Sequence, residues 1–307
     1  TMPSTPPTYT LITIPYSHFN EKARFMLDIY DLPYTEHSFL PFYHLIGVWS
    51  KTWGVKGWNP KKEKTSSPYS VPILIRNEKR ERRIVAQDSR IIGQILAKEN
   101  QSTLDLHHDD QRVQQWDVYL TEQLGPVSRS VVQSVMFADP STKLFLEIVH
   151  RHSRSALEYA FFRTMVFLGA FSLMKKMFRI STASQIQRHY EALERILQKV
   201  EEELADGREY LCGSEMSLAD ITLATVGSIV IGVQQDEGNT ASLPSLDQLA
   251  EDAKRLAPDR KAQVDTYVEF VKRWRQKKTG QLILKVSARH RGVCSRINRL
   301  PFEPQRG

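Results

Sequence analysis

The stretch PYSHFNEKARFMLDIYDLPY, residues 15–34, places a polar corner at the start of an amphipathic segment. Within it, Phe19, Ala23, Leu27 and Tyr30 recur at the spacing of one helical face, which predicts a helix. The apolar run TYTLITI precedes the corner, and the run YTEHSFL that follows the helix is typical of a second strand. We therefore predict a strand, a helix and a second strand in succession, which indicates an α/β unit.

The first hundred residues continue this alternation, whereas the rest of the chain is helical. The runs PILI and RRIVA flank turn residues 77–79 and predict a hairpin, and DSRIIGQILAKEN predicts a helix packed back on the sheet. Further helices are expected at about 109–135, 141–178, 184–205, 217–233, 245–256 and 260–290. We expect an α/β domain at 1–100, a polar linker at 101–108, an all-α domain at 109–291 and a basic tail at 292–307.

Composition limits the classes of function. The chain has 307 residues with 41% hydrophobic content, enough for a buried core, and a net charge of +7. Its basic residues are spread over several helices and the tail without interleaved aromatic residues, so we expect no nucleic-acid partner. The two cysteines, Cys212 and Cys294, lack the spacing of a disulfide framework or a zinc site. A reducing compartment and no metal site are expected.

Targeting and membrane segments are not evident in the pattern. The stretch TMPSTPPT lacks the basic and apolar blocks of a signal peptide, so we expect a cytoplasmic protein. The best apolar candidate, from Tyr159 to Met174, is interrupted and shorter than the roughly 18 residues that span a bilayer. A buried core helix is the favoured interpretation, with no integral membrane segment. A peripheral membrane protein that uses residues 161–178 and the basic tail is a weaker hypothesis.

Ser17 and Asn20 lie at the head of the first predicted helix. A helix N-terminus presents unpaired N–H groups and a partial positive charge, which stabilise an anion placed over it. A hydroxyl at that position donates one more hydrogen bond. A thiolate held there has a lowered pKa and is nucleophilic at neutral pH. A plain helix N-cap is the alternative for Ser17.

Two residue pairs further along the chain are also candidates for ligand binding. In YSVPILI, the Val71–Pro72 bond precedes a short strand, where a cis peptide exposes the Val71 backbone to an extended ligand. An ordinary trans proline is the alternative. In IVAQDSRIIGQIL, Asp88 and Ser89 begin a helix, so the helix N–H groups and the Ser89 hydroxyl suit a carboxylate and Asp88 suits an ammonium group. Simple capping is the alternative for this pair.

The fixed order of these three features resembles the N-terminal, thioredoxin-like domain of the glutathione transferases. The segment YLCGSEMSLADITLA is similar to a segment of that family's C-terminal domain, and RWRQKKTGQLILKVSARHR is similar to the closing helix of a bacterial-type branch. The resemblance covers roughly residues 9–291. It implies a thioredoxin-like domain followed by an all-α domain. In the SLAD segment, Ser217 and Asp220 also have a complete structural account as a capping box.

The resemblance implies that glutathione is a co-substrate. It implies that Ser17 activates the glutathione thiol, that Val71, before Pro72, binds the cysteinyl backbone, and that Asp88 and Ser89 hold the γ-glutamyl end. A small apolar electrophile as second substrate, a role in detoxification and a homodimer are also implied.

Two departures from the family pattern leave alternatives open. The sequence SHFN lacks the cysteine that related transferases often carry at the Asn20 position, which disfavours disulfide exchange. Asn20 and, with less support, Tyr16 are alternatives to Ser17 as the donor to the thiolate. Residues 41–70 form an enlarged segment where the family binds the glycyl carboxylate. A transferase-fold protein that binds ligands with little or no catalysis is therefore the alternative to an active transferase.

Overall fold

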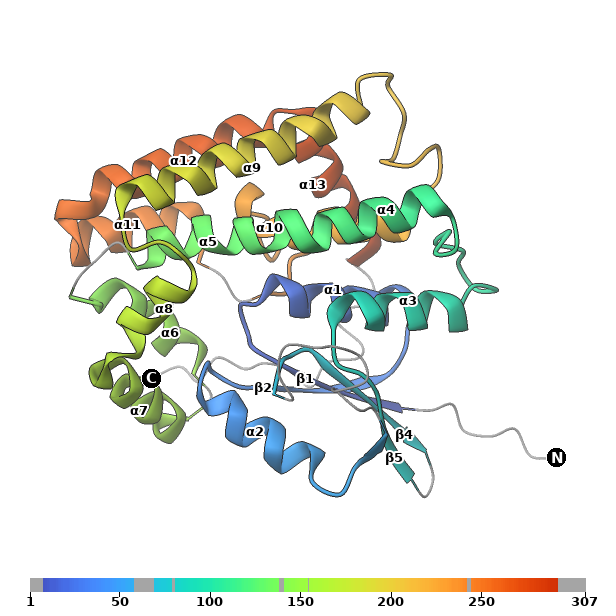
Figure 1. Cartoon of the computed structure of the whole chain (residues 1–307), viewed down its shortest axis with the longest axis horizontal. Helices are drawn as coiled ribbons and strands as arrows, with labels where there is room; N and C mark the ends of the chain where they lie inside the picture. Colours follow the sequence, from blue (N-terminus) through green and yellow to red (C-terminus); the bar gives the residue numbers. More distant parts are fainter. Residues whose placement is uncertain are drawn as a thin grey trace.

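The computed structural model describes residues 8–57, 69–78, 81–137, 141–153, 155–241 and 244–291. Its N-terminal part contains the predicted strands and helices in the predicted order (Figure 1). Helix α2 and the short strand β3 lie in the enlarged segment at 41–70, for which the sequence analysis predicts no helix or strand. The elements are β1 (Thr8–Thr13), α1 (His18–Ile29), β2 (Tyr34–Ser38), α2 (Tyr43–Thr52), β3 (Lys56–Gly57), β4 (Ile73–Glu78), β5 (Glu81–Ala86) and α3 (Ser89–Glu99).

The strands form one mixed sheet in the order β2-β1-β4-β5-β3. Strand β1 is parallel to β2 and antiparallel to β4, and β4 is antiparallel to β5. Helices α1 and α3 cover one face of this sheet and α2 covers the other (Figure 1). Alternation along β1 explains this, because Leu11 belongs to the main core whereas Ile12 belongs to a small second core with Val48 of α2. The arrangement is thioredoxin-like.

The elements that follow α3 are helices. The helix expected at 109–135 is confirmed as a continuous run of α4, a π-helical turn and α5. The helices expected at 141–178 and 260–290 are each divided in two, the first because Ser153 has an extended backbone after α6. The elements are α4 (Gln111–Tyr119), η1 (Leu120–Leu124), α5 (Gly125–Met136), α6 (Lys143–His152), α7 (Ala156–Met165), η2 (Val166–Ala170), α8 (Phe171–Met177), α9 (Ala183–Glu203), α10 (Leu218–Ile231), α11 (Leu246–Leu256), η3 (Pro258–Arg260), α12 (Lys261–Arg275) and α13 (Lys278–Arg291).

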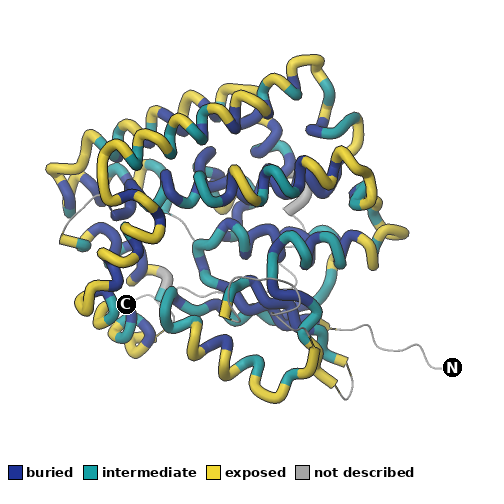
Figure 2. Tube along the Cα trace, in the orientation of Figure 1, coloured by how far each residue is buried: buried dark blue, intermediate teal, exposed yellow. Residues whose placement is uncertain are grey.

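The N-terminal and C-terminal parts share one hydrophobic core, in which Leu27 of α1 and Leu223 of α10 both take part. Buried residues concentrate where the sheet, α1 and the helices above them meet (Figure 2). An ion pair between Lys22 of α1 and Asp117 of α4 is completely buried at this junction. The Thr222 hydroxyl of α10 donates to the same Asp117 oxygen at 2.6 Å. Three helices therefore meet at one buried carboxylate.

The predicted linker, residues 101–108, lies between the end of α3 and the start of α4. The exact limits of the two domains stay a prediction, and the tail at 292–307 lies outside the described residues.

The capping box at the start of α10 is confirmed. Asp220 is buried, and its Oδ2 accepts hydrogen bonds from the Ser217 N–H at 2.9 Å and the Ser217 hydroxyl at 2.7 Å. Its Oδ1 accepts from the Leu211 N–H at 2.7 Å. Asp220 is therefore occupied by structural contacts.

The unit formed by α7, η2 and α8 departs from the buried core helix predicted around Tyr159 to Met174. Residues Ala156–Met177 are long and apolar enough to cross a membrane by length and composition only, and 33% of the 18-residue apolar window within them is buried. The run is not a straight helix, because Gly169 has a positive φ of 98° and bends it. Only one side of this unit contributes to the core.

Candidate functional site

A cavity of about 440 Å³ lies where the N-terminal part meets the helices of the C-terminal part. The loops after β1 and β2 and the segment before Pro72 form one wall, and α5, α6, α8 and α10 contribute to the other. Most of the lining side chains are apolar, which is typical of small-molecule sites. The polar or predicted residues that line it include Tyr16, Ser17, His18, Val71, Arg129 and Gln133.

Ser17 is the residue at which α1 begins, and its hydroxyl makes no cap hydrogen bond. Its backbone is extended, with φ −84° and ψ 119°, and its N–H donates to the Ile14 carbonyl at 3.3 Å to close the corner after β1. The residue is half-buried and lines the cavity. The hydroxyl is thus available to a ligand, beside the N–H groups of the first helical turn.

Asn20 and Tyr16, the alternatives to Ser17, have different surroundings. Asn20 is fully buried, its Nδ2 donates to the Ile14 carbonyl at 3.1 Å, and it is not among the residues that line the cavity. Tyr16 lines the cavity, but its hydroxyl is buried and has no hydrogen-bond partner among the described residues. Burial, and secondly the charge of Glu158, raise the pKa of Tyr16 above its usual range. Tyr16 is therefore protonated at neutral pH.

The peptide bond between Val71 and Pro72 is cis, so the trans alternative does not apply. Val71 lines the cavity, and its backbone N–H and C=O form no hydrogen bond with the described residues. Gln87, just before α3, donates from Nε2 to the Ser70 carbonyl at 2.7 Å. This bond holds the segment against the start of α3 and leaves the Val71 backbone open to an extended ligand.

Asp88 and Ser89 lie at the start of α3. Asp88 caps the helix, since its Oδ1 accepts from the N–H groups of Arg90 at 2.8 Å and Ile91 at 3.1 Å. Its Oδ2 forms no hydrogen bond with the described residues, so capping leaves one oxygen for a ligand. Ser89 is buried, and neither residue lines the cavity itself. The Gln87 bond nevertheless brings this pair next to the cavity wall.

His18, to which the sequence analysis assigned no role, lines the cavity beside Ser17. Its Nε2 lies 3.0 Å from the Gly125 carbonyl oxygen, and Nε2 carries the proton because a carbonyl only accepts. A Cβ at position 125 would lie 2.6 Å from the Phe19 ring, so glycine permits this close approach of α1 and α5. Burial, and secondly the charge of Arg129, lower the pKa of His18 to about 3. His18 is therefore neutral at pH 7 and is a poor proton acceptor.

The buried, neutral His18 makes the stability of the protein depend on pH. Its pKa is about 3 in the folded state and about 6.5 in the unfolded state, so the unfolded state binds more protons between these values. The stabilising contribution is complete above pH 6.5 and is lost as the pH falls toward 3. Between pH 7 and 5, we expect the wild type to lose roughly 2 kcal/mol more unfolding free energy than His18→Gln, measured by urea denaturation. Equal losses in both proteins would contradict this expectation.

Arg129 of α5 is a cation in the cavity wall. It forms no hydrogen bond or ion pair with the described residues, and its Nε is buried. Its guanidinium lies over the Phe178 ring, 4.9 Å from the centroid, and burial lowers the pKa of Arg129. The Oε1 of Gln133, one turn further along α5, and the Nδ1 of His44 are also buried without partners in the described part of the chain. Because buried polar atoms are normally hydrogen-bonded, this cluster indicates a ligand with polar groups.

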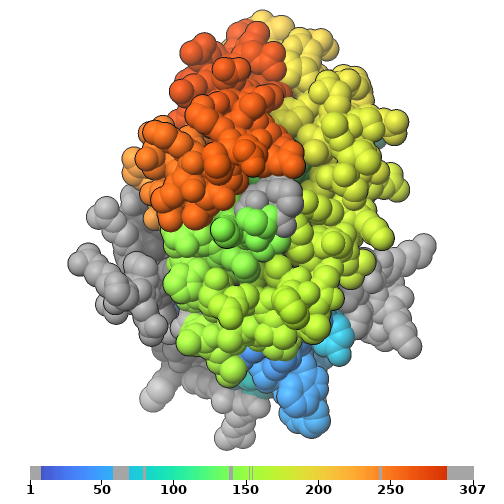
Figure 3. All heavy atoms as spheres, turned by 90° about the vertical axis from the view of Figure 1, so that its left-hand side faces the viewer, coloured from blue at the N-terminus to red at the C-terminus, as the bar shows by residue number. Residues whose placement is uncertain are grey.

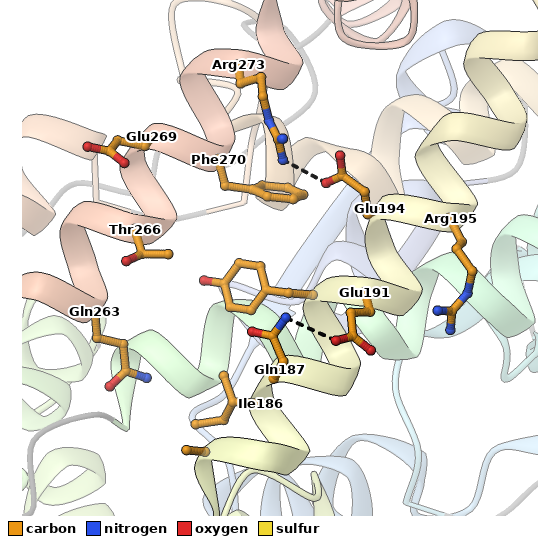
Figure 4. A pocket seen from close by; sticks show the side chains of 12 residues that line it. Ile186, Gln187, Glu191, Glu194, Arg195, Gln263, Thr266, Glu269, Phe270 and Arg273 are labelled. Carbon is orange, nitrogen blue, oxygen red and sulfur yellow. Dashed lines mark hydrogen bonds and ion pairs between the residues drawn. The ribbon is translucent and has the colours of Figure 1, made fainter.

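A larger and more open groove of about 910 Å³ lies between α9 and α12 (Figure 4). Polar side chains on its rims pair with each other: Gln187 donates to Glu191 at 3.1 Å, and Arg273 donates to Glu194 at 2.7 Å. No predicted site residue lines this groove. The candidate site is therefore the cavity beside Ser17.

The enlarged segment at 41–70 contributes His44 and Leu45 of α2 to the cavity. Residues 58–68 lie outside the described residues. Among the residues that the structure describes, no group of three or more histidine, cysteine, aspartate or glutamate side chains is arranged to hold a metal ion.

One family model matches part of the C-terminal helical region. The family model described as "Glutathione S-transferase, C-terminal domain" matches residues 183–237, from the start of α9 to just beyond α10. A search of curated proteins found no significant match. Similar solved structures include glutathione transferase F7 from Populus trichocarpa, at 14% identity over 91% of this chain and 98% of that chain, with a TM-score of 0.45.

Two bacterial structures are similar to the same extent. A glutathione transferase family member from Pseudomonas fluorescens, with two glutathione bound, is 14% identical over 90% of this chain and 92% of that chain, with a TM-score of 0.45. A glutathione transferase from Burkholderia graminis, with two glutathione molecules bound per subunit, is 16% identical over 91% of this chain and 88% of that chain, also with a TM-score of 0.45. Because these scores are below 0.5, the assignment of the fold depends on the topology and the family model.

The fold is that of the glutathione transferases, with a thioredoxin-like N-terminal domain followed by an all-α C-terminal domain. The family-model match at residues 183–237 supports a relationship of the chain to the glutathione transferase superfamily.

Proposed function

We propose that the chain is a glutathione transferase of a serine type, which activates the glutathione thiol at Ser17 for addition to an electrophile. One observation carries the proposal. The Ser17 hydroxyl is at the N-terminus of α1, makes no cap hydrogen bond and belongs to the cavity lining. A thiolate at this position receives a hydrogen bond from the hydroxyl and the favourable field of the helix N-terminus.

The other predicted residues hold glutathione in the proposed complex. The cysteinyl part pairs with the backbone N–H and C=O of Val71, next to the cis bond to Pro72. The γ-glutamyl ammonium group binds Oδ2 of Asp88, and the γ-glutamyl carboxylate binds the Ser89 hydroxyl and the start of α3. The residue assignments rest on the resemblance and on the open bonding positions described above.

The proton of the thiol leaves to solvent in this proposal. Tyr16 is already protonated, and the low pKa of His18 makes it a weak acceptor. The thiolate sulfur then attacks the electrophilic carbon. With an aryl halide, the new carbon–sulfur bond forms as the carbon–halogen bond breaks, and halide leaves with the electron pair.

The second substrate in this proposal has an apolar body and an anionic group. A buried charge without a partner is costly, and Arg129 has no partner among the described residues. A carboxylate on the electrophile would neutralise the guanidinium and orient the reactive carbon toward the Ser17 corner. A bacterial-type branch, a homodimer, a cytoplasmic location and a role in detoxification are further parts of the proposal.

Calorimetric titration with reduced glutathione, followed by conjugation assays, tests the proposed function. We expect glutathione to bind and to be conjugated to a chlorodinitrobenzene and to its carboxylate-bearing analogue, a chlorodinitrobenzoate. Binding without turnover would favour the alternative of a ligand-binding protein with little or no catalysis. If glutathione does not bind, the proposal is wrong.

Arg129→Met tests the assignment of the anionic group in the same assay. We expect the KM for the chlorodinitrobenzoate to rise about 10- to 100-fold, because a charge-assisted hydrogen bond is lost. The neutral chlorodinitrobenzene is the matched control, and its KM should change by less than about 3-fold. Equal changes for the two electrophiles would exclude Arg129 as the anion-binding residue.

A further inference from the structure

The described residues expose ten large hydrophobic side chains, and all ten lie on α2 or directly after it, at Tyr69, or on the α7–η2–α8 unit. Residues of α7 and α8 occupy the lower part of the face seen in Figure 3, with α2 next to them. The two elements touch through the rings of Tyr43 and Phe161, whose centroids are 5.6 Å apart. We call these ten residues the apolar surface: Leu45, Ile46, Trp49, Trp53, Tyr69, Leu157, Phe167, Leu168, Leu173 and Met177. Apolar side chains gathered in this way mark an interaction site.

The most exposed part of the apolar surface is the bend at Gly169. Phe167 is 89% exposed and Leu168 is 70% exposed, immediately before the bend. A Cβ added to Gly169 would meet nothing within 4 Å, so the bend projects into open space. The opposite side of the same unit anchors it in the core through residues spaced by four: Phe162, Val166, Ala170, Met174 and Phe178. The bend therefore exposes two apolar side chains on a unit whose other side is packed in the core.

Positive charge surrounds the bend. Residues 156–179 contain four basic residues and one acidic residue. Arg163, Lys176 and Arg179 are exposed, whereas the acidic residue, Glu158, is buried and accepts a hydrogen bond from the Leu40 N–H. Residues 39–57, which include α2, contain lysines but no aspartate or glutamate. The two segments that carry most of the apolar surface therefore have an excess of basic over acidic residues.

We propose that the apolar surface docks peripherally on a membrane that contains anionic phospholipids. Insertion of Phe167 and Leu168 to the depth of the headgroup boundary would remove them from water, and the exposed basic residues would meet the lipid phosphates. A second copy of the chain fits less well, because a two-fold contact at this surface brings identical basic groups together. The bend at Gly169 suits a helix that lies in the interface and does not cross the bilayer.

The proposed surface is continuous with the mouth of the cavity. Leu45 and Met177 belong to both, since each is exposed and each lines the cavity. A docked protein would therefore take up an electrophile from the lipid phase at the cavity mouth. This last consequence rests on the proposed function, whereas the docking itself does not.

Flotation of the full chain with vesicles, in the absence of glutathione, tests the docking. We expect binding to phosphatidylcholine vesicles that contain phosphatidylserine, and weaker binding to phosphatidylcholine alone or at high salt. The double variant Phe167→Ser/Leu168→Ser should bind at least about 10-fold more weakly while it keeps the wild-type melting temperature. These two side chains are exposed, so their replacement does not affect the core.

Two double variants with the same change in net charge separate the effect of basic residues near the bend from the effect of the net charge of the protein. Lys176→Glu/Arg179→Glu should weaken vesicle binding about 10-fold or more. Lys98→Glu/Lys277→Glu changes the net charge equally at exposed positions on α3 and after α12, and should change binding by less than about 3-fold. The proposal would be overturned if the wild type did not bind anionic vesicles, or if the two pairs of variants weakened binding equally. It would also be overturned if the wild type formed a dimer and bound no vesicles, and Phe167→Ser/Leu168→Ser dissociated that dimer.

Discussion

Replacing Lys22 by methionine should lower the free energy of unfolding by about 3–5 kcal/mol. The side chains of Lys22 and Asp117 are fully buried and pair with each other between α1 and α4. Methionine fills a similar volume but leaves the Asp117 carboxylate in the core with the Thr222 hydroxyl as its remaining partner. Loss of the counter-ion lowers the free energy of unfolding far more for a buried charge than for a charge on the surface. Urea denaturation followed by circular dichroism measures the effect.

Two control variants make this result specific to the ion pair. Lys98→Met removes an exposed lysine from α3 and should change stability by less than about 0.5 kcal/mol. The double variant Lys22→Met/Asp117→Leu removes both charges and should recover a large part of the loss. A loss below about 1 kcal/mol in Lys22→Met would show that the pair does not join the two parts of the protein.

Replacing Ser17 by alanine should lower kcat/KM for glutathione conjugation about 10- to 100-fold near neutral pH. The variant loses a hydrogen bond to the thiolate, and such bonds to charged groups contribute about 1.5–3 kcal/mol. Stability should stay within about 0.5 kcal/mol of the wild type, because the Ser17 hydroxyl makes no cap hydrogen bond in the folded protein. Steady-state kinetics at several pH values, together with urea denaturation, separate the two effects.

Ser17→Thr and Ser102→Ala are the matched controls. Ser17→Thr keeps a hydroxyl at the corner and should retain more activity than Ser17→Ala. Ser102 is exposed in the turn after α3, so Ser102→Ala should behave as wild type. Unchanged kinetics in Ser17→Ala would transfer the role to Asn20 or Tyr16. Of these two, Tyr16 lines the cavity, whereas Asn20 does not line it and holds the corner by its bond to Ile14.

Much of the fold could be predicted because its elements have strong local periodicity. Ala23 and Leu27, spaced by one helical turn, are both buried on the core side of α1. The hairpin of β4 and β5 and the capping box at Asp220 are likewise determined by residues close together in the chain. Helix α2 was missed because Gly47 and the five aromatic residues from Phe39 to Trp53 obscure its helical pattern.

The remaining features of the site depend on contacts between distant residues. The hydrogen bond of His18 to the Gly125 carbonyl joins residues 107 positions apart. The position of α5 in the fold places Arg129 in the cavity wall. The sequence pattern, including its spacing from Gln133, does not distinguish it from a surface arginine. The α7–η2–α8 unit has apolar residues on both its buried and its exposed sides, so periodicity could not distinguish buried Phe162 from exposed Phe167.

The measurement that tests the central claim most directly is the pKa of the glutathione thiol in the complex, from the pH dependence of thiolate absorbance at saturating protein. A free cysteine thiol has a pKa of about 8.5, and we expect the bound thiol of the wild type to lie at least about one unit lower. In Ser17→Ala the pKa should return upward by about one unit, which corresponds to about 1.4 kcal/mol. A bound thiol with the pKa of free glutathione, or equal values in the wild type and Ser17→Ala, would contradict a thiolate held by Ser17.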